Sequence, residues 1–414
     1  ERGDWMSVPK LRFKADDGSD YPELTVAKLD DLCEKIGDGL HGTPIYFQTG
    51  NYYFINGNNL ENGKIIVSSD TPKVNDSVFE KNNKELNDST ILMSINGTIG
   101  KVAYYNNEKV MLGKSVAYFK VNYKCIKEYC YQLIQTASVQ CQFQKGLTGS
   151  TIKNLGLNTI KNTNVKVPCL PEQQKIAEFL STVDTVIEKQ KETVSAWEER
   201  KKGVMQKLFG QEVRFKADNG SEFPEWEEKY LSDIASFHSG LTYTPDDVVD
   251  SENGILVFRS SNIQNGRIAY DDNVYVDKEL KEKNYVKLHD IVVCVRNGSK
   301  SLVGKNALVT ESDLNATWGA FMTVIRAKQN YEFIHQYLNS TFFKKEMYKD
   351  SGTATINQIT TAMLNDCKLF VPSIAEQQKI ADCLSSLDEV IEKQKATLAA
   401  WEELKKGLLQ QMFV

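Results

Sequence analysis

The sequence predicts an α+β protein in which two globular, mixed α/β domains are joined by two long helices that pair antiparallel as a coiled coil, with an internal pseudo-twofold repeat. Three observations lead to this prediction. Two sequence blocks occur twice at a nearly constant offset, the second block of each copy opens a heptad pattern, and short apolar runs of strand type lie between the blocks. The length of 414 residues, with 41% hydrophobic and 25% charged residues, suits a globular protein of more than one domain.

The first half of the chain returns in the second half. Arg-Phe-Lys-Ala-Asp begins at Arg12 and again at Arg214, and Glu-Gln-Gln-Lys-Ile-Ala begins at Glu172 and again at Glu376. The sequence between these anchors has diverged. Two copies are too few for a solenoid and favour a pseudo-twofold molecule. We therefore expect four segments, which are globular at 1–168, helical at 169–211, globular at 212–370 and helical at 371–414.

Both Glu-Gln-Gln blocks are typical of the first turn of a helix. Proline is tolerated there and a carboxylate favours the positive end of the helix, although Ala375 replaces Pro171 in the second copy. Apolar residues then recur at alternating steps of four and three, which predicts coiled-coil helices at 171–209 and 375–413, each about 57 Å long at 1.5 Å per residue. The expected seam residues are Ile176, Leu180, Val183, Ile187, Val194 and Trp197 in the first helix, and Ile380, Leu384, Leu387, Ile391, Leu398 and Trp401 in the second.

Polar residues interrupt both seams at equivalent positions, at Gln190 and Lys201 and at Gln394 and Lys405. Buried polar residues in a seam can fix its register, whereas lysines can also extend their ammonium groups to solvent. The alternative to a coiled coil is that each helix is amphipathic and packs only on its own globular domain.

The globular segments contain apolar strand-type runs at 91–95 and 291–295, each followed by a glycine-containing turn, at 96–101 and 297–305. The second turn is not a P-loop, because it has an extra residue between its glycines and Asn306 where Ser or Thr should follow the lysine. Each turn is either a hairpin bent by glycine or a loop whose lysine and amides approach a phosphate backbone.

Charge is distributed unevenly, and the total of −5 hides this distribution. Residues 1–90 carry 10 basic and 16 acidic side chains, a net charge of −6, whereas residues 91–170 carry 10 basic and 2 acidic, a net charge of +8. Cations position a protein on phosphates, while amides and arginine read base edges, so polar loops near the two turns are either solvated loops or DNA contacts. The candidate DNA-binding residues are Asn96, Thr98, Lys101, Lys114, Gln144, Lys145, Thr148, Lys153, Arg259, Asn262, Arg267, Arg296, Asn297, Ser299, Lys300 and Lys305.

Nothing in the sequence indicates catalysis or a metal site. It has no GxGxxG after a strand, no GxSxG, HExxH or Walker A motif, and no tetrapeptide typical of amino-methyltransferases. Its eight cysteines include no CxxC pair and its four histidines share no repeat position, so we expect reduced thiols and a cytoplasmic protein. No apolar run is long enough for a membrane span and no signal-peptide pattern opens the chain.

The layout resembles the specificity subunit of type I restriction-modification enzymes. The resemblance rests on the strand and glycine loop at 91–101 with its counterpart at 291–305, and on the segments 167–177 and 371–381 that lead into the heptad helices. It covers essentially the whole chain. The repeated helix start is a specific signal and the glycine loop is a weaker one.

The resemblance implies two target-recognition domains, each reading one half of a split sequence in double-stranded DNA. The helices would act as a ruler and as the docking surface for two modification subunits, which bind S-adenosylmethionine and methylate adenine. Separate restriction subunits would use ATP and Mg²⁺ to move and cut DNA. This chain would then hold no cofactor, perform no catalysis, contact no membrane and act in the cytoplasm of a bacterium or archaeon. The alternatives are a stand-alone DNA-binding regulator and a coiled-coil scaffold with no enzyme partner.

Overall fold

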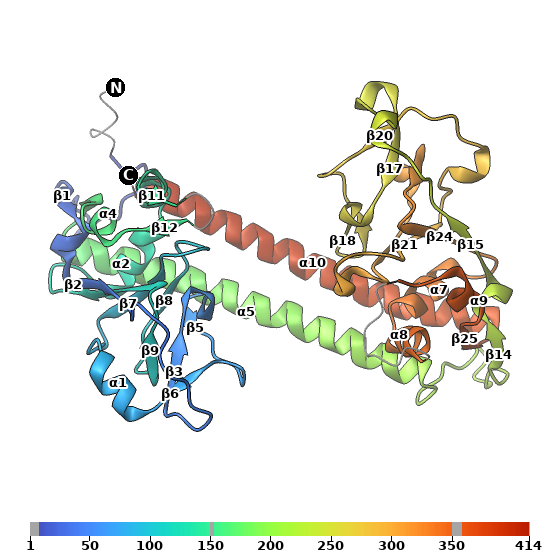
Figure 1. The fold of residues 1–414 in the computed structure, drawn as a ribbon, viewed down its shortest axis with the longest axis horizontal. Coiled ribbons are helices and arrows are strands. Elements are labelled where there is room, and N and C mark those ends of the chain that lie inside the picture. The colour runs from blue at the N-terminus through green and yellow to red at the C-terminus, as the bar shows by residue number, and fades with distance from the viewer. Residues whose placement is uncertain (1–7, 150–152, 350–357, 414) are drawn as a thin grey trace. The chain divides into compact units, whose positions relative to one another are not determined.

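The computed structural model describes residues 8–149, 153–349 and 358–413 (Figure 1). The chain divides into two compact units, which are described separately below. Unit 1 comprises Glu1–Lys191 and Ala396–Val414, and unit 2 comprises Glu192–Lys395. Each long helix therefore begins in one unit and ends in the other.

Unit 1 is built on a four-stranded antiparallel sheet with the order β2-β10-β7-β8. Its central strands, β7 and β10, are buried along their whole length, which explains why the strand predicted at 91–95 reads as a continuous apolar run. A second sheet, β6-β3-β9, pairs β3 with β9 in parallel. The strands are β1 (Thr25–Lys28), β2 (Cys33–Asp38), β3 (Tyr52–Ile55), β4 (Leu60–Glu61), β5 (Lys64–Ile65), β6 (Lys73–Val74), β7 (Thr90–Ser94), β8 (Val102–Tyr104), β9 (Val110–Leu112), β10 (Val116–Val121), β11 (Leu147–Thr148), β12 (Asn154–Leu155) and β13 (Asn164–Val167).

Unit 2 repeats this topology. Its antiparallel sheet has the order β15-β24-β21-β22, and its second sheet, β16-β20-β17-β23, also contains one parallel pair, β17 with β23. The internal repeat expected from the two sequence blocks is therefore confirmed, although most of the intervening sequence differs. The strands are β14 (Glu227–Tyr230), β15 (Ala235–Ser239), β16 (Val248–Val249), β17 (Ile255–Phe258), β18 (Ile263–Gln264), β19 (Arg267–Ile268), β20 (Tyr275–Val276), β21 (Ile291–Cys294), β22 (Asn306–Leu308), β23 (Ala316–Trp318), β24 (Met322–Ala327) and β25 (Lys368–Val371).

Short helices cover the sheets of both units. The α-helices of unit 1 are α1 (Asp76–Asn82), α2 (Lys127–Ile134), α3 (Ala137–Lys145) and α4 (Leu157–Lys161), and those of unit 2 are α6 (Leu231–Ile234), α7 (Tyr331–Leu338), α8 (Thr341–Tyr348) and α9 (Thr361–Asn365). The 3-10 helices are η1 (Leu29–Leu32), η2 (Gly57–Asn59), η3 (Pro245–Asp247), η4 (Ser251–Asn253), η5 (Ser260–Asn262), η6 (Glu282–Asn284), η7 (Lys300–Leu302) and η8 (Glu311–Asp313).

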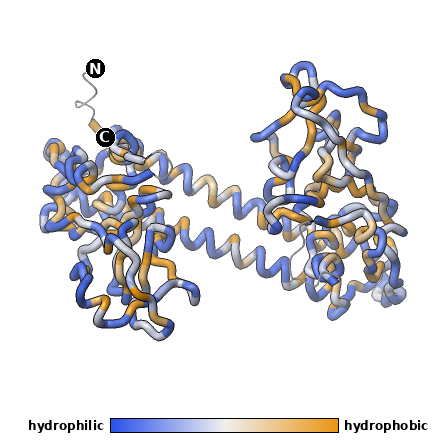
Figure 2. Tube along the Cα trace, in the orientation of Figure 1, coloured by the Kyte–Doolittle hydropathy of each residue, from blue (hydrophilic) through white to orange (hydrophobic). Residues whose placement is uncertain are grey.

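The two long helices lie within one residue of their predicted bounds, as α5 (Leu170–Phe209) and α10 (Ile374–Met412). Hydrophobic and hydrophilic positions alternate along both (Figure 2). In unit 1, Lys191 pairs with Glu402 (3.1 Å) and Lys405 with Asp184 (2.6 Å). Residue numbers thus rise along one helix as they fall along the other, so the helices are antiparallel, as expected.

Unit 2 has the same helix pairing, with Lys395 bound to Glu198 (2.8 Å) and Lys201 to Asp388 (2.6 Å). The two lysines that interrupt the seams therefore hold carboxylates of the facing helix. Most of the proposed seam residues are buried, and the half-buried ones are Trp197, Leu387, Leu398 and Trp401.

The start of each long helix also packs on the globular core of its own unit. Ile176 and Leu180 belong to the core of unit 1, and Ile380 and Leu384 belong to the core of unit 2. The alternative of an amphipathic helix on its own domain thus describes the first turns of both helices, while the cross-helix ion pairs lie further along. The other end of α10 also enters the core of unit 1, where the Phe413 ring that follows it stacks on Tyr129 at a centroid distance of 5.4 Å.

The two best-preserved sequence blocks contact each other in both units. Arg12 Nη2 lies 2.6 Å from Glu172 Oε2, and Arg214 Nη2 lies 2.9 Å from Glu376 Oε2. The glutamate side chains are only 1% and 0% exposed. A buried carboxylate needs a paired cation, so these contacts tie the segment before β1 or β14 to the start of the long helix and explain why both blocks occur in both copies.

Candidate nucleic-acid interface

Two of the predicted DNA-binding residues of unit 1, Asn96 and Lys114, line one cleft. The turn between β7 and β8 begins at Asn96, which forms a β-bridge with Asn154, and Gly97 N donates a hydrogen bond to Lys153 O (3.1 Å). Lys114, which follows β9, lies in the same cleft, whose volume is about 530 Å³. Three segments far apart in sequence therefore present polar side chains to one depression.

Other predicted residues of unit 1 border this cleft or lie apart from it. Thr148 pairs with Asn154 across β11 and β12, and Gln144 and Lys145 are exposed at the end of α3, just before β11. Thr98 is exposed in the turn itself. Lys101 lies elsewhere, in a smaller cavity beside Gly63 and Tyr131. The turn is a glycine-bent hairpin, with Gly97 at φ +70° and Gly100 at φ +87°, and whether it also approaches a phosphate backbone stays a prediction.

The cleft also contains a histidine that sequence reasoning missed. His41 Nε2 lies 2.6 Å from Asp38 Oδ2, and the imidazole is 71% exposed. Leu40 forms a parallel β-bridge with Gly113, which brings the loop after β2 beside Lys114. A signal was present in the sequence, because Gly-Leu-x-x-Thr-Pro occurs at 39–44 and again at 240–245.

In unit 2 the equivalent turn carries different side chains. Arg296 stands at the position of Asn96 and lies over the ring of Phe321 at 5.5 Å. Asn297 Nδ2 donates to Ser260 Oγ (2.9 Å), and Asn297 Oδ1 accepts from Ser299 N (2.9 Å). These contacts hold the turn against η5, with Lys300 next along the chain in η7. Phe321, 58% exposed, is a second candidate that the sequence did not single out.

The prediction that Asn262 contacts DNA needs correction, because the side chain of Asn262 is fully buried. Its Nδ2 donates to Ala269 O (3.0 Å), and its Oδ1 accepts from Arg259 N (3.0 Å). Asn59 makes the same two bonds in unit 1, to Ile66 O (2.8 Å) and from Asn56 N (2.9 Å). Both asparagines therefore fold a loop, and we withdraw Asn262 from the candidate interface.

Two of the remaining basic candidates of unit 2, Arg259 and Arg267, are held by acids, and the third, Lys305, ends the turn that Arg296 begins. Arg259 Nη2 lies 2.8 Å from Asp272 Oδ1. The pKa of Asp272 is lowered, first by a hydrogen bond from Ser261 and next by the positive charge of Arg259. Arg267 is 69% exposed and lies 3.4 Å from Glu392 of α10. Lys305, at the end of the turn, is half-buried. The candidates therefore do not form one continuous surface in unit 2.

The described residues contain no group of three or more His, Cys, Asp or Glu side chains arranged to hold a metal ion. Among the helices that the structure describes, none is both long and apolar enough to cross a membrane.

A family model described as the type I restriction modification DNA specificity domain matches this chain twice, at residues 22–195 and 224–400. The StySPI type I restriction enzyme specificity subunit of Salmonella potsdam is 30% identical over 198 residues, which are 46% of this chain and 42% of that protein. The chain thus aligns with less than half of that relative. The MjaIX specificity subunit of Methanocaldococcus jannaschii is 24% identical over 425 residues, 97% of this chain and 96% of that protein.

Solved structures have the same fold. The S subunit of a type I restriction-modification system from M. genitalium superposes with a TM-score of 0.53 at 17% identity, covering 99% of both chains. A second solved structure is described as showing complex assembly and conformational transition of the type I restriction-modification system. One of its chains superposes with a TM-score of 0.53 at 15% identity, covering 94% of this chain and 97% of that one.

Proposed function

Because the chain belongs to the family of type I restriction-modification DNA specificity domains and contains two such domains, we propose that each unit reads one half of a split target in double-stranded DNA. The long helices set the spacing between the half-sites. The chain itself performs no catalysis and supplies sequence specificity to a larger complex.

One observation carries this proposal, namely that the same backbone presents different side chains in the two units. The bridges Leu40 with Gly113 and Leu241 with Gly319 define equivalent loops. Next to these bridges, unit 1 presents His41 and Lys114, whereas unit 2 has Thr242 and Ala320. Readers with one fold and different contact residues are what two different half-sites require.

The side chains at these sites match the chemistry of base and phosphate recognition. Arginine and asparagine form paired hydrogen bonds with guanine and adenine edges in the major groove, and lysine ammonium groups bind phosphates. In this proposal Asn96, His41 and Arg296 read bases, and Lys114 and Lys153 position the backbone.

The partners follow from the same family. Two modification subunits dock on α5 and α10, bind S-adenosylmethionine and methylate adenine, and restriction subunits use ATP and Mg²⁺ to move and cut DNA. The net charge of −5 supports a reader that does not bind DNA alone, since modification subunits would supply much of the phosphate-binding charge. The complex acts in the cytoplasm of a bacterium or archaeon.

Co-expression with a modification subunit, followed by methylome sequencing, tests the proposal. We expect a bipartite methylated motif. The double variant His41→Ala, Lys114→Ala should change or relax one half of that motif, and Arg296→Ala should change only the other half. Lys81→Ala on α1 removes one exposed charge away from the cleft and should leave both halves unchanged. A stable complex that adds no new motif, or a motif whose two halves change together, would contradict the proposal.

A further inference from the structure

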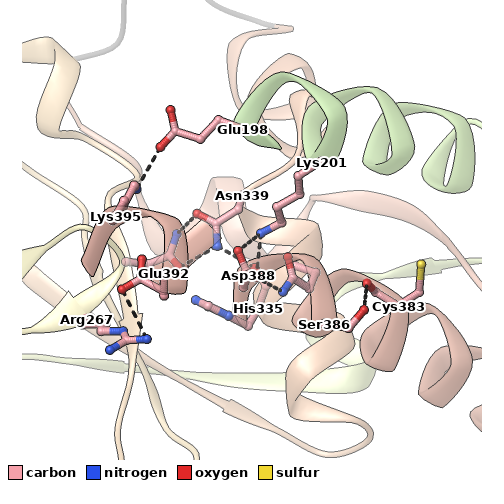
Figure 3. Close-up of polar contacts among 12 residues, drawn as sticks. Glu198, Lys201, Arg267, His335, Asn339, Cys383, Ser386, Asp388, Glu392 and Lys395 are labelled. Carbon is pink, nitrogen blue, oxygen red and sulfur yellow. Dashed lines mark hydrogen bonds and ion pairs between the residues drawn. The ribbon is translucent and has the colours of Figure 1, made fainter. Parts of the chain in front are cut away.

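Unit 2 contains a cavity of about 760 Å³ beside the long helices. Its walls come from the hairpin β18–β19, from α7, and from the parts of α5 and α10 that belong to unit 2 (Figure 3). Apolar side chains in the lining include Ile268, Leu308 and Ile391. Cavities of this size and composition hold small molecules in many proteins.

Most of the charged side chains around the cavity are paired with an opposite charge. Lys201 binds Asp388 (2.6 Å), and Arg267 lies 3.4 Å from Glu392 (Figure 3). Lys395 binds Glu198 at 2.8 Å across the two helices. Asp313 has no cation paired with it among the described residues, but it accepts hydrogen bonds from the Tyr270 hydroxyl and from Thr310 N (2.6 Å), so the cavity does not favour an ionic ligand.

His335 of α7 is the exception to this pairing. Its Nε2 atom is inaccessible to solvent and has no hydrogen-bond partner among the described residues. Burial, and then the charge of Lys201, lower the pKa of His335 to about 4, so the imidazole is neutral near pH 7. Burying a polar atom without a hydrogen bond is unfavourable, and a ligand with one hydrogen-bonding group would offset this cost.

The repeat provides an internal comparison, because unit 1 fills the equivalent place with its own side chains. Gln132 binds Asp184 (2.6 Å) in unit 1 and Gln336 binds Asp388 (2.9 Å) in unit 2, so the preceding residues, Tyr131 and His335, are equivalent.

Strand register gives a second equivalence. Tyr104 pairs with Ile91 in β7, and Leu308 pairs with Ile291 in β21. In unit 1, Tyr104 and Tyr131 stack with ring centroids 4.2 Å apart, and Lys405 Nζ lies 6.0 Å from the Tyr131 centroid. Unit 2 has neither ring.

The free space beside two equivalent glycines at the hairpin tips differs between the two units. A Cβ atom added at Gly63 would lie 2.9 Å from the hydroxyl of Tyr131, whereas a Cβ added at Gly266 would have no atom within 4 Å. The cavity beside Gly63 and Tyr131 in unit 1 measures about 290 Å³, and its lining includes no residue of α5 or α10. The aromatic pair that closes the hairpin onto the helices in unit 1 is therefore missing in unit 2, and the space remains.

We propose that this cavity binds a small, uncharged, planar aromatic molecule that carries one hydroxyl or N–H group. The ring takes the place that Tyr104 and Tyr131 occupy in unit 1, between Leu308 and the hairpin. His335 lines the cavity, and its Nε2 atom, which is covered in this structure, meets the polar group when the imidazole turns toward the ring. The ammonium of Lys201 lies near the ring, as that of Lys405 does in unit 1. This inference is independent of the proposed DNA recognition, since it rests on the comparison of the two units.

The first experiment titrates the full-length protein with p-cresol, which reproduces the tyrosine side chain. We expect saturable binding at one site, with a dissociation constant on the order of 1 mM for a ligand of this size. The imidazole NMR signals of His335 should shift on titration. Cyclohexanol, which has a hydroxyl but no aromatic ring, should bind at least about tenfold more weakly.

Two double variants make the test specific. Leu308→Tyr with His335→Tyr supplies the missing ring pair and should abolish p-cresol binding while the protein stays folded by circular dichroism. Tyr104→Leu with Tyr131→His should open the equivalent site in unit 1 and raise the stoichiometry from one to two. If this second variant does not fold, the first decides the question alone.

The inference fails if p-cresol shows no saturable binding up to about 20 mM, well above the expected dissociation constant. It also fails if binding survives in Leu308→Tyr with His335→Tyr, because the ligand would then lie elsewhere. A folded Tyr104→Leu, Tyr131→His protein that still binds one ligand would equally overturn the argument from the repeat.

Discussion

Replacing Arg12 with alanine should destabilise unit 1 by about 3 kcal/mol. The change leaves the Glu172 carboxylate, 1% exposed, without the two guanidinium hydrogen bonds of 3.0 and 2.6 Å that it accepts. Removing one partner of a fully buried pair typically costs about 3–5 kcal/mol. Because the Arg12 side chain is 23% exposed, water can partly reach the site, and the lower end of that range applies.

Urea unfolding followed by circular dichroism measures this loss, and amide hydrogen exchange of the start of α5 locates it in unit 1. Lys14→Ala is the matched control in the same sequence block. Lys14 and Asp20 are 65% and 83% exposed and 3.6 Å apart, so the expected change is below about 0.5 kcal/mol. The double variant Arg12→Ala, Glu172→Gln should recover part of the stability, since no charge remains buried.

Unit 2 offers a graded comparison. Glu376 accepts a further hydrogen bond from Trp226 Nε1 (3.0 Å), so it keeps one partner in Arg214→Ala. The loss there should be smaller than in Arg12→Ala by about 1.5 kcal/mol, the usual contribution of a hydrogen bond to a charged group. A loss below about 1 kcal/mol for Arg12→Ala, within the range of surface pairs, would refute the reasoning.

Three further predictions concern pH, the corrected residue and the helices. Burial lowers the pKa of His335 from 6.5 to about 4, so on acidification the unfolded state takes up this proton before the folded state does. The free energy of unfolding should therefore be unaffected by this group above pH about 6.5 and fall by about 3 kcal/mol as the pH drops to 4. Urea unfolding of His335→Gln should lose this part of the pH dependence. Asn262→Ala should lower stability by about 2 kcal/mol without changing the methylated motif, whereas Arg296→Ala should do the reverse, as melting curves and methylome sequencing would show. Deleting one heptad from each long helix, residues 188–194 and 392–398, should shorten the spacer by about 3 base pairs, since seven residues span about 10 Å, or abolish methylation.

The sequence predicted the regular parts of the fold well because their signals are local. The heptad pattern located α5 and α10 to within one residue, and the apolar run at 91–95 located β7, a strand buried on both faces. The contact between Arg12 and Glu172 could not be predicted, since the two residues are 160 positions apart and a charge pattern carries no distance.

The candidate site was harder to predict than the fold. A polar residue in a loop looks the same in sequence whether it folds the loop or faces a ligand, and for that reason Asn262 was misassigned. The repeat of Gly-Leu-x-x-Thr-Pro at 39–44 and 240–245 marks the loop of His41, but the position of this loop beside Lys114 depends on the bridge between Leu40 and Gly113, which the strand register reveals. The cavity of unit 2 likewise becomes visible only when Leu308 is aligned with Tyr104 through the sheet.

The return of α10 into unit 1 has a consequence for how the chain is made. Unit 2 is continuous in sequence, from Glu192 to Lys395, so all of it emerges from the ribosome before residues 396–412, the last part of α10, do. Unit 1 cannot close its core until Met412 and Phe413 arrive, although its sheets are synthesised first. The domain translated first is thus completed last, and a chain that stops just after Lys395 would leave unit 1 open and aggregation-prone while unit 2 remains whole.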